Sequence, residues 1–283
     1  MSNQPEIFGI VNITTDSFSD GGKYLDQSSL GEHINKLTRD GANTLDLGAA
    51  SSNPEANPVD PLLEMERLDR ALDIIAAAKA SGAIPSHLRI SVDSFKPEVQ
   101  RFALNKNVDY LNDIAGFGDP TVYDALAQSN CQLVIMHSIQ QGIANRDRVS
   151  PDSILDQILG FFDRRIQDLT RAGINRTRII LDPGMGFFLG SDPECSYTVL
   201  RSLDSIRDEF SLPLLVSVSR KSFLGALTRR GPEERQAATL GAEIYLAENG
   251  VEFIRTHEPA PLLDALKVRR AIAGPTDAAQ GII

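Results

Sequence analysis

The sequence predicts a single (β/α)8 barrel, an α/β fold, and three observations lead to this fold class. Eight short runs rich in Val, Ile and Leu are spread along the chain, and a polar residue follows each run. Segments with helical periodicity lie between many of the runs, as in a parallel sheet with helical crossovers. The runs are nearly continuously apolar, as expected for strands covered on both faces. Eight such units favour a closed barrel over an open doubly wound sheet, which remains the alternative.

The predicted strands leave room for a helix between most consecutive pairs. In order, they cover residues 7–11, 44–45, 88–92, 110–111, 133–136, 179–181, 214–218 and 253–254. The clearest helical periodicity lies in residues 62–80, 153–172 and 234–249, and a further helix is expected to begin near Ser222. We interpret the Pro-rich segment 51–61 and the segment 138–151 as long loops after strands.

The length of the chain fits a single (β/α)8 barrel domain. A chain of 283 residues could form about two average domains, but barrels of this class often fill about 250 residues or more as one. We assign residues 1–273 to one barrel domain and expect a disordered tail at residues 274–283, where small residues dominate.

Composition excludes several functional classes. The net charge of −10 argues against general binding to nucleic acid or to an anionic membrane, because both need a basic surface. Neither a dinucleotide-binding G-x-G-x-x-G pattern nor a P-loop pattern occurs. Cys131 and Cys195 are isolated, and residues 1–10 lack a signal-peptide pattern, so we expect a cytoplasmic protein.

Residues that accept hydrogen bonds, donate them or carry charge follow every predicted strand. They are Asn12, Asp46, Asp93, Asn112, Asp113, His137, Asp182, Ser219, Lys221, Arg255 and His257. Barrel enzymes carry their active sites at the carboxyl ends of the strands, so we expect these side chains to converge on one mouth. Buried acids are costly unless they are paired or used, and this concentration therefore predicts an active site.

Three segments add chemical detail to this mouth. Residues 12–22 form a polar loop with two acids and one aromatic ring that could cover a ligand. Residues 181–188 combine two glycines and a proline with the aromatic pair Phe187 and Phe188. Lys221 and Ser222 stand at the start of the helix expected near Ser222, where backbone N–H groups and positive charge favour an anion.

Metal binding is predicted only in a weak form. The four histidines lack the spacing of zinc ligands, which argues against a permanent zinc site. A hard cation such as Mg²⁺ could be held by Asn12 together with substrate oxygens, because Mg²⁺ takes few protein ligands when phosphates are present.

In combination, these patterns resemble the dihydropteroate synthase family along residues 9–257. Matching motifs include Asp182-Pro-Gly-Met-Gly-Phe187 and Ser219-Arg-Lys-Ser-Phe223, together with residues 9–22, 46–48, 91–93, 112–113, 136–137 and 254–257. Any one of them alone is weak, but the set is specific. The resemblance implies a (β/α)8 homodimer that uses Mg²⁺ to join 6-hydroxymethyl-7,8-dihydropterin diphosphate to p-aminobenzoate, giving 7,8-dihydropteroate and diphosphate for folate synthesis.

The resemblance also implies residue roles, carried over by motif position. The pterin-binding residues are Asp93, Asn112, Met136, Asp182 and Lys221. The diphosphate site consists of Asn12, Arg255 and His257, and Asn12 is also the expected metal ligand. The p-aminobenzoate pocket consists of Ser52, Pro54, Phe187, Phe188, Lys221 and Ser222. Asp16, Phe18 and Asp20 lie in the mobile first loop, and the catalytic set is Asp20, Asp93, Asp182, Lys221, Arg255 and His257.

The chemistry of these residue types suits such a reaction. A pterin edge carries both hydrogen-bond donors and acceptors, so carboxylates and amides are the groups that can recognise it. Diphosphate leaves readily only when cations neutralise its charge. The aromatic amine is already neutral at pH 7 and needs no strong general base, so positioning and charge stabilisation carry most of the catalysis.

Three departures from the family pattern point to a subtype. Asn53 stands where the family usually has an Arg in the second loop, which puts that residue's contact in doubt, and Thr15 replaces a usual Pro. Phe188 is an inserted aromatic after the Gly186–Phe187 pair. These features resemble the sulfonamide-insensitive synthases, in which an extra ring could exclude a drug that projects beyond the substrate's outline. A drug-sensitive housekeeping enzyme is the alternative.

Two other functional classes remain as alternatives. A pterin-binding methyltransferase would keep Asp93, Asn112 and Asp182, but it has no need of cations around a diphosphate. A non-catalytic pterin-binding protein would not need them either. The presence of the expected cations Lys221, Arg255 and His257, together with Asn12, therefore favours the synthase.

Overall fold

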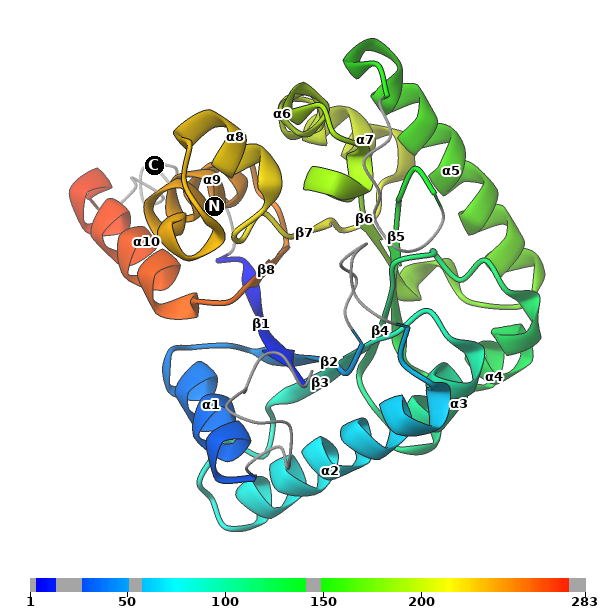
Figure 1. Cartoon of the computed structure of the whole chain (residues 1–283). Coiled ribbons are helices and arrows are strands. Elements are labelled where there is room, and N and C mark those ends of the chain that lie inside the picture. The colour runs from blue at the N-terminus through cyan, green and yellow to red at the C-terminus, as the bar shows by residue number, and fades with distance from the viewer. Residues whose placement is uncertain (1–3, 14–26, 51–57, 141–148, 275–283) are drawn as a thin grey trace, which may run out of the picture.

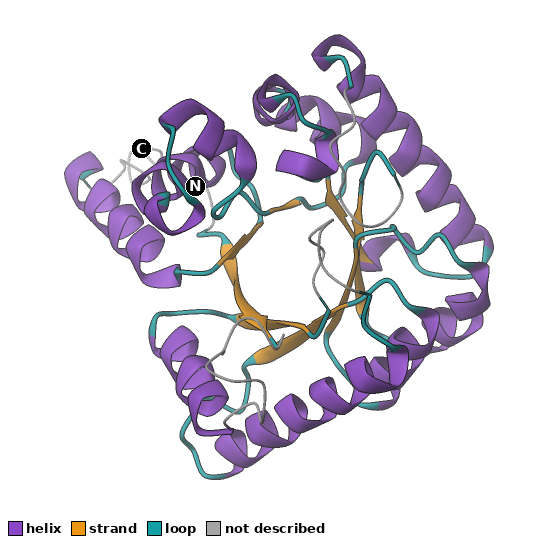
Figure 2. Ribbon diagram, viewed as in Figure 1, coloured by secondary structure: helices purple, strands orange, loops and turns teal. Residues whose placement is uncertain are grey.

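The computed structural model describes residues 4–13, 27–50, 58–140 and 149–274, and its centre is a ring of eight parallel strands (Figure 2). The strands are β1 (Glu6–Asn12), β2 (Thr44–Gly48), β3 (Arg89–Asp93), β4 (Tyr110–Asp113), β5 (Gln132–Met136), β6 (Ile179–Asp182), β7 (Leu215–Val216) and β8 (Phe253–Thr256). Their order is β6-β5-β4-β3-β2-β1-β8-β7, and a single bridge from Leu181 to Leu214 joins the two ends of the sheet. The predicted single-domain barrel is therefore confirmed, with a seam between β6 and β7.

The helices form an outer layer around the strands (Figure 1). They are α1 (Gln27–Arg39), α2 (Pro61–Ala80), α3 (Pro97–Asn105), α4 (Tyr123–Gln128), α5 (Pro151–Arg171), α6 (Pro193–Arg201), α7 (Leu203–Phe210), α8 (Ser222–Thr228), α9 (Gln236–Glu248) and α10 (Pro259–Ala273). Short 3-10 turns are η2 (Pro120–Val122), η3 (Arg176–Arg178), η4 (Gly186–Leu189) and η5 (Pro232–Glu234). No helix within the described ranges has both the length and the apolar character needed to cross a membrane.

Local sequence accounts for where the long helices begin. Asp60, Ser150 and Asp192 each precede a proline and accept a hydrogen bond from a backbone N–H of the first turn of α2, α5 and α6. A capping side chain satisfies a donor that the helix leaves free, and proline suits the first turn because it lacks that donor.

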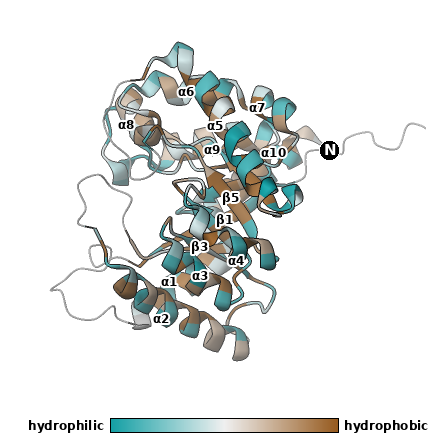
Figure 3. Ribbon diagram, turned by 90° about the vertical axis from the view of Figure 1, so that its right-hand side faces the viewer, coloured by the Kyte–Doolittle hydropathy of each residue, from teal (hydrophilic) through white to brown (hydrophobic). Residues whose placement is uncertain are grey.

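The two faces of each strand have different neighbours. Outward side chains pack against the helices in the main hydrophobic core, and the strands lie at the apolar centre of the molecule in Figure 3. Inward side chains form a smaller apolar cluster inside the ring. This inner cluster comprises Phe8, Tyr110, Val134, Ile180, Leu215 and the partly buried Phe253.

A polar layer lies directly above this inner cluster. Strand side chains alternate between faces, so a residue two positions further along a strand points to the same side. For five members of the inner cluster, the residue two positions later in the sequence lines the functional site. These site residues are Asn112, Met136, Asp182, Ser217 and Arg255. The inner cluster fills the barrel below, and the functional site is thereby confined to the carboxyl ends of the strands.

Several predicted bounds differ from the structure. The run 44–45 continues to Gly48, so Asp46 lies within β2 rather than after it. The run 214–218 contains only the two strand residues of β7, Leu215 and Val216. The helix predicted from residue 234 begins at Gln236, after the turn η5. Of the predicted tail, only Gly274 belongs to the described residues.

Candidate active site

A narrow pocket opens at the carboxyl end of the barrel. It is lined by Asp93, Asn112, Ile114, Met136, Asp182, Met185, Phe188, Ser217, Lys221 and Arg255. The cavity between these side chains measures about 30 Å³.

Arg255 is the centre of the charged groups in this pocket. Its Nε donates to Asp46 Oδ2 over 2.5 Å, and its Nη2 donates to Asp93 Oδ2 over 2.8 Å. Burial alone would lower the pKa of Arg255, but the charges of Asp46 and Asp93 raise it well above its ordinary value. The guanidinium thus stays charged and fixes the orientation of the Asp93 carboxyl.

The two pocket carboxyls titrate near neutrality. Burial raises the pKa of Asp93 to about 7, although the charge of Arg255 opposes the shift. Burial also raises the pKa of Asp182 to about 6, against a hydrogen bond of 2.8 Å from the Gly184 N–H to its Oδ1. Near pH 7 these groups can accept hydrogen bonds as carboxylates or donate one when protonated.

Lys221 contributes a cation on the opposite wall. It lies at the start of α8, and its Nζ is 4.8 Å from the centroid of the Phe188 ring. Burial, with the charge of Arg255, lowers the pKa of Lys221 to about 8, so the ammonium still predominates at pH 7. The preceding Arg220 has φ 59°, and its N–H donates to Thr239 Oγ1 over 3.1 Å, which holds this turn.

Two polar atoms of the pocket have no hydrogen-bond partner among the described residues. They are the Oδ1 atom of Asn112 and the Oγ atom of Ser217. Buried polar atoms are rarely left unpaired, because each costs about 1–3 kcal/mol when it lacks a partner. Their presence beside Asp93 and Asp182 indicates a site built for a ligand with several polar edge atoms.

His257 lies beside the pocket in a neutral state. Its Nδ1 is 2.9 Å from Ser219 Oγ, and Ser219 Oγ also accepts from the His257 N–H over 3.3 Å. Burial, together with the charges of Arg220 and Arg255, lowers the pKa of His257 to about 3. Of the three expected cations, only Lys221 and Arg255 are therefore charged at neutral pH in the free protein.

The two neighbouring phenylalanines of η4 have different surroundings. Phe188 is 6% exposed and packs with Ile114 and Met136 in the pocket wall, whereas Phe187 is 37% exposed. A Cβ built on Gly186 would lie 2.9 Å from Ser222 Oγ, so η4 lies directly against the start of α8. Phe188, expected in the p-aminobenzoate pocket, thus lies among the side chains expected to bind pterin.

Asn12 lies at the mouth, at the end of β1. A Cβ built on Gly48 would be 3.8 Å from Asn12 Oδ1 and 4.0 Å from Asp93 Oδ2, so Gly48 separates the amide from the carboxyl. Across the described part of the chain, no three His, Cys, Asp or Glu side chains gather into a metal site. A single exposed amide oxygen fits a cation that takes most of its ligands from phosphate and water.

Two residues expected at the mouth are directed elsewhere, and that expectation is wrong. Asp113 follows Asn112 on the opposite face of β4 and accepts hydrogen bonds behind the pocket wall. His137 Nδ1 is 3.3 Å from Pro183 O, and burial lowers the pKa of His137 to about 4.

The sequence reasoning also missed pocket residues. Ile114, Met185 and Ser217 line the pocket. Of these, only Ser217 could have been identified from the sequence, because it lies two residues after Leu215 and alternation places both on the same face. Other predicted site residues lie outside the described residues. These are Thr15, Asp16, Phe18, Asp20, Ser52, Asn53 and Pro54.

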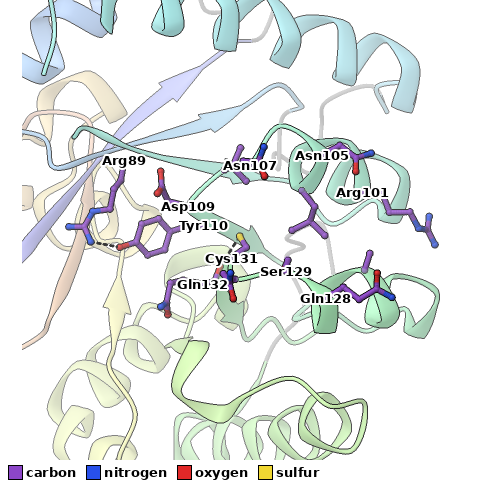
Figure 4. A pocket seen from close by; sticks show the side chains of 14 residues that line it. Arg89, Arg101, Asn105, Asn107, Asp109, Tyr110, Gln128, Ser129, Cys131 and Gln132 are labelled. Atoms are coloured by element: carbon purple, nitrogen blue, oxygen red, sulfur yellow. Dashed lines mark hydrogen bonds between the residues drawn. The ribbon is translucent and has the colours of Figure 1, made fainter. Parts of the chain in front are cut away.

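A larger cavity of about 780 Å³ lies at the other end of the barrel, at the starts of β3 to β5 (Figure 4). Two of its charged groups are paired: Arg89 donates to the Tyr110 hydroxyl over 2.8 Å, and Asp109 accepts from the Ile90 N–H. Burial raises the pKa of the Cys131 thiol to about 12, which makes it unreactive at neutral pH. The reactive groups therefore lie in the smaller pocket.

Comparisons with known proteins agree with this placement. A family model described as "Pterin binding enzyme" matches residues 8–257. The chain is 53% identical over 266 residues to "Dihydropteroate synthase type-2" of Escherichia coli, covering 94% of this chain and 95% of that protein. It is 49% identical over 268 residues to the type-3 protein of Escherichia coli, covering 94% and 99%.

A solved structure extends the likeness to the fold. The dihydropteroate synthase of Xanthomonas albilineans, solved with 4-aminobenzoic acid, aligns with a TM-score of 0.82 at 33% identity, covering 96% of this chain and 94% of that one. The family match includes residues of all eight strands and all the residues that line the pocket. This chain therefore belongs to the pterin-binding enzymes and, among them, to the dihydropteroate synthases.

Proposed function

We propose that this chain joins 6-hydroxymethyl-7,8-dihydropterin diphosphate to p-aminobenzoate, forming 7,8-dihydropteroate and diphosphate. The observation that carries the proposal is the pocket that combines Asp93, Asn112 and Asp182 with the half-buried cation of Lys221. A pterin edge presents N–H donors to the two carboxylates and acceptors to the ammonium. Met136 supplies apolar contact to the flat ring.

The chemical step separates charge across the pocket. The bond between the pterin methylene carbon and the diphosphate oxygen breaks, and its electron pair leaves with diphosphate. Arg255 and Lys221 stabilise the negative charge that leaves, while Asp93 and Asp182 stabilise the positive charge that develops on the pterin. The amine nitrogen of p-aminobenzoate then bonds to the methylene carbon and releases one proton to solvent.

The mouth residues fit the diphosphate. His257 is neutral in the free protein, and a nearby anion would raise its pKa and favour the protonated ring. We assign Asn12 as the protein ligand of Mg²⁺, which when bound supplies further charge neutralisation on the diphosphate. Asp20, in the first loop, belongs to the proposed catalytic set by resemblance.

We assign the p-aminobenzoate site to the region around η4. Phe187 offers an exposed ring, and Ser222 with Lys221 offers a hydroxyl and a positive charge for the carboxylate of p-aminobenzoate. Ser52 and Pro54 complete this proposed pocket. The likeness to a synthase solved with 4-aminobenzoic acid supports the assignment.

The test is a coupled assay of diphosphate release with both substrates present. We expect Mg²⁺-dependent release that falls about a hundredfold or more in Lys221→Met and Asp182→Asn. Arg230→Met, which removes an exposed cation far from the pocket, is the control. Absence of release by the unmodified protein, with methyl transfer from methyltetrahydrofolate instead, would favour the methyltransferase alternative.

We further propose that the enzyme is insensitive to sulfonamides. The adjacent Phe187 and Phe188 crowd one short turn beside the start of α8, and an inserted ring there leaves less room for a group that projects beyond p-aminobenzoate. Sulfamethoxazole inhibition should be weak in the unmodified protein and stronger after deletion of Phe188, at p-aminobenzoate concentrations scaled to each KM. Strong inhibition of the unmodified protein would sink this proposal and favour a drug-sensitive housekeeping enzyme.

We also propose a cytoplasmic homodimer. Helices α8 and α10 both pack on α9 (Figure 1). They expose the large apolar side chains of Leu227, Val268 and Ile272. Cys131 and Cys195 are free thiols, as expected in a reducing compartment. Sedimentation of the protein and of Ile272→Glu tests the dimer, because a charge in the interface should shift it toward monomer.

A further inference from the structure

A buried glutamine lies directly behind the pocket wall. Gln100 of α3 is 1% exposed, and its Nε2 donates to Ser94 O over 2.9 Å and to Asp113 Oδ2 over 2.7 Å. Ser94 follows Asp93, and Asp113 follows Asn112. Gln100 therefore ties together the ends of β3 and β4 from the side that faces away from the pocket.

Asp113 extends this contact into the next loop. Its Oδ1 accepts from the Ala115 N–H over 2.6 Å, and its Oδ2 accepts from the Phe117 N–H over 2.9 Å. Phe117 has φ 54°, so the turn depends on these bonds to hold a backbone conformation unfavourable for its side chain. The same turn begins at Ile114, whose side chain lines the pocket.

These contacts converge on the pair that faces the ligand. Asp93 and Asn112 are register partners on adjacent strands, and the Ser94 N–H donates to Asn112 O over 3.0 Å. Gln100 bonds the residue after each of them, so its two hydrogen bonds connect the positions that follow Asp93 and Asn112.

We propose that Gln100 and Asp113 are positioning residues that hold Asp93, Asn112 and Ile114 in the geometry that binds the pterin. The inference rests on the proposed pterin pocket. Neither residue touches the substrate. A displacement of about 1 Å in a binding group can cost about a hundredfold in rate, so hydrogen bonds behind the wall can affect binding without touching the ligand.

The test separates this role from simple support of the fold. Gln100→Leu keeps the buried volume but removes both donors, and Asp113→Asn keeps the shape while replacing one acceptor with a donor. Thr44→Val is the matched control, because Thr44 is fully buried and donates to Glu6 Oε1 over 2.9 Å at the opposite end of the barrel. Each variant is measured well below its melting temperature.

We expect the affinity for 6-hydroxymethylpterin, measured by calorimetry, to fall about tenfold or more in Gln100→Leu and in Asp113→Asn. The KM for the pterin substrate should rise in parallel, while the KM for p-aminobenzoate stays within about twofold. The double variant should lose little more than either single variant, since the two residues act through one contact. Thr44→Val should melt earlier without losing pterin affinity.

An equal rise in both KM values, or unchanged pterin affinity in a folded Gln100→Leu protein, would overturn the proposal. If Gln100→Leu fails to fold, Asp113→Asn carries the same comparison. Calorimetry needs no turnover, so it remains decisive even if the diphosphate assay fails. Asp93→Asn is the reference variant: a loss of affinity there without a loss in Gln100→Leu contradicts the positioning role alone.

Discussion

The protonation state of Asp93 depends on opposing effects in this pocket. Its carboxyl is bonded to Arg255, yet burial and the nearby Asp46 keep its pKa near 7. Lys221, on the other wall, has its pKa lowered to about 8 by the same burial. The interior of the barrel thus brings the pKa values of an acid and a base close to neutrality.

The first prediction concerns pH. The carboxylates of Asp93 and Asp182 are lost as pH falls through about 7 and about 6, and the charge of Lys221 is lost as pH rises through about 8. The kcat/KM for the pterin substrate, which reports the free enzyme, should therefore be bell-shaped, with its maximum between about pH 7 and pH 8. Asp182→Asn should make the acid limb less steep, because Asp93 still titrates, and Lys221→Met should flatten the alkaline limb. His257→Asn should leave the acid limb in place, because the pKa of His257 is about 3.

The adjacent residues Asn112 and Asp113 show how far the site could be predicted from the sequence. Asn112 and Asp113 cannot both face the pocket, since adjacent strand residues point to opposite sides. The prediction placed both at the mouth, although the alternation already excluded one of them. The pairing of Asp46 in β2 with Arg255 in β8 was beyond sequence reasoning, because the two residues are 209 positions apart along the chain.

At the scale of elements, the turn after β6 is shaped by close approach. Gly184 has φ 74°, and a Cβ built there would lie 2.3 Å from the carbonyl oxygen of His137. This contact leads the chain from Asp182 into η4, which carries Phe187 and Phe188. The glycines and proline were recognised as an unusual backbone path, but their neighbour at His137 was not visible in the sequence.

The second prediction tests this close approach. Gly184→Ala should lose stability through both the positive φ and the collision, whereas Gly173→Ala has a positive φ and open space around its Cβ. In Gly173→Ala, we expect backbone strain to lower the free energy of unfolding by about 1–2 kcal/mol. Gly184→Ala should lose about 1–3 kcal/mol more. Chemical denaturation measures both, and equal losses would show that the contact with His137 yields easily.

The third prediction concerns the packing of α9 on β8. Burial raises the pKa of Glu243 to about 8, where its carboxyl bonds Thr256 and its Oε1 has no partner within the described chain. The folded state therefore holds a proton that the unfolded chain releases near pH 4.5. Stability falls as pH rises between these values, by up to about 1.4 kcal/mol per pH unit.

Glu243→Gln removes this proton-linked loss while keeping the shape. The variant should gain stability relative to the unmodified protein from pH 5 to pH 8, and the difference should level off above pH 8. Denaturation at several pH values measures the difference. A constant difference across the range would mean that Glu243 is ionised in the folded protein.

At the scale of the whole molecule, the barrel is closed unevenly. The predicted fold class follows from eight recurring units, and every strand was located, but the uneven closure was not foreseen. β1 and β2 pair over five residues, while a single bridge joins the β6 and β7 edges. A run of apolar residues reveals where a strand lies, not how many of its backbone groups find a partner.

The fourth prediction follows from this unevenness. Amide hydrogens of β7, such as those of Leu215 and Val216, should exchange about tenfold faster or more than those of Val11 and Leu47 in β1 and β2. Hydrogen exchange read by mass spectrometry compares the two regions. Uniform protection around the ring would mean that side-chain packing alone holds the seam.

The seam also passes through the ligand pocket. Asp182 lies on one side of it, and Ser217 with Lys221 lies on the other. A bound pterin that touches both sides acts as a bridge where the backbone supplies few bonds. Two inhibitors of equal affinity, added at the same concentration, should therefore stabilise the folded protein equally, because this stabilisation depends on ligand concentration and affinity. Only the inhibitor that spans the seam should slow exchange in β7, and local protection would thus reveal how a compound sits without a solved complex.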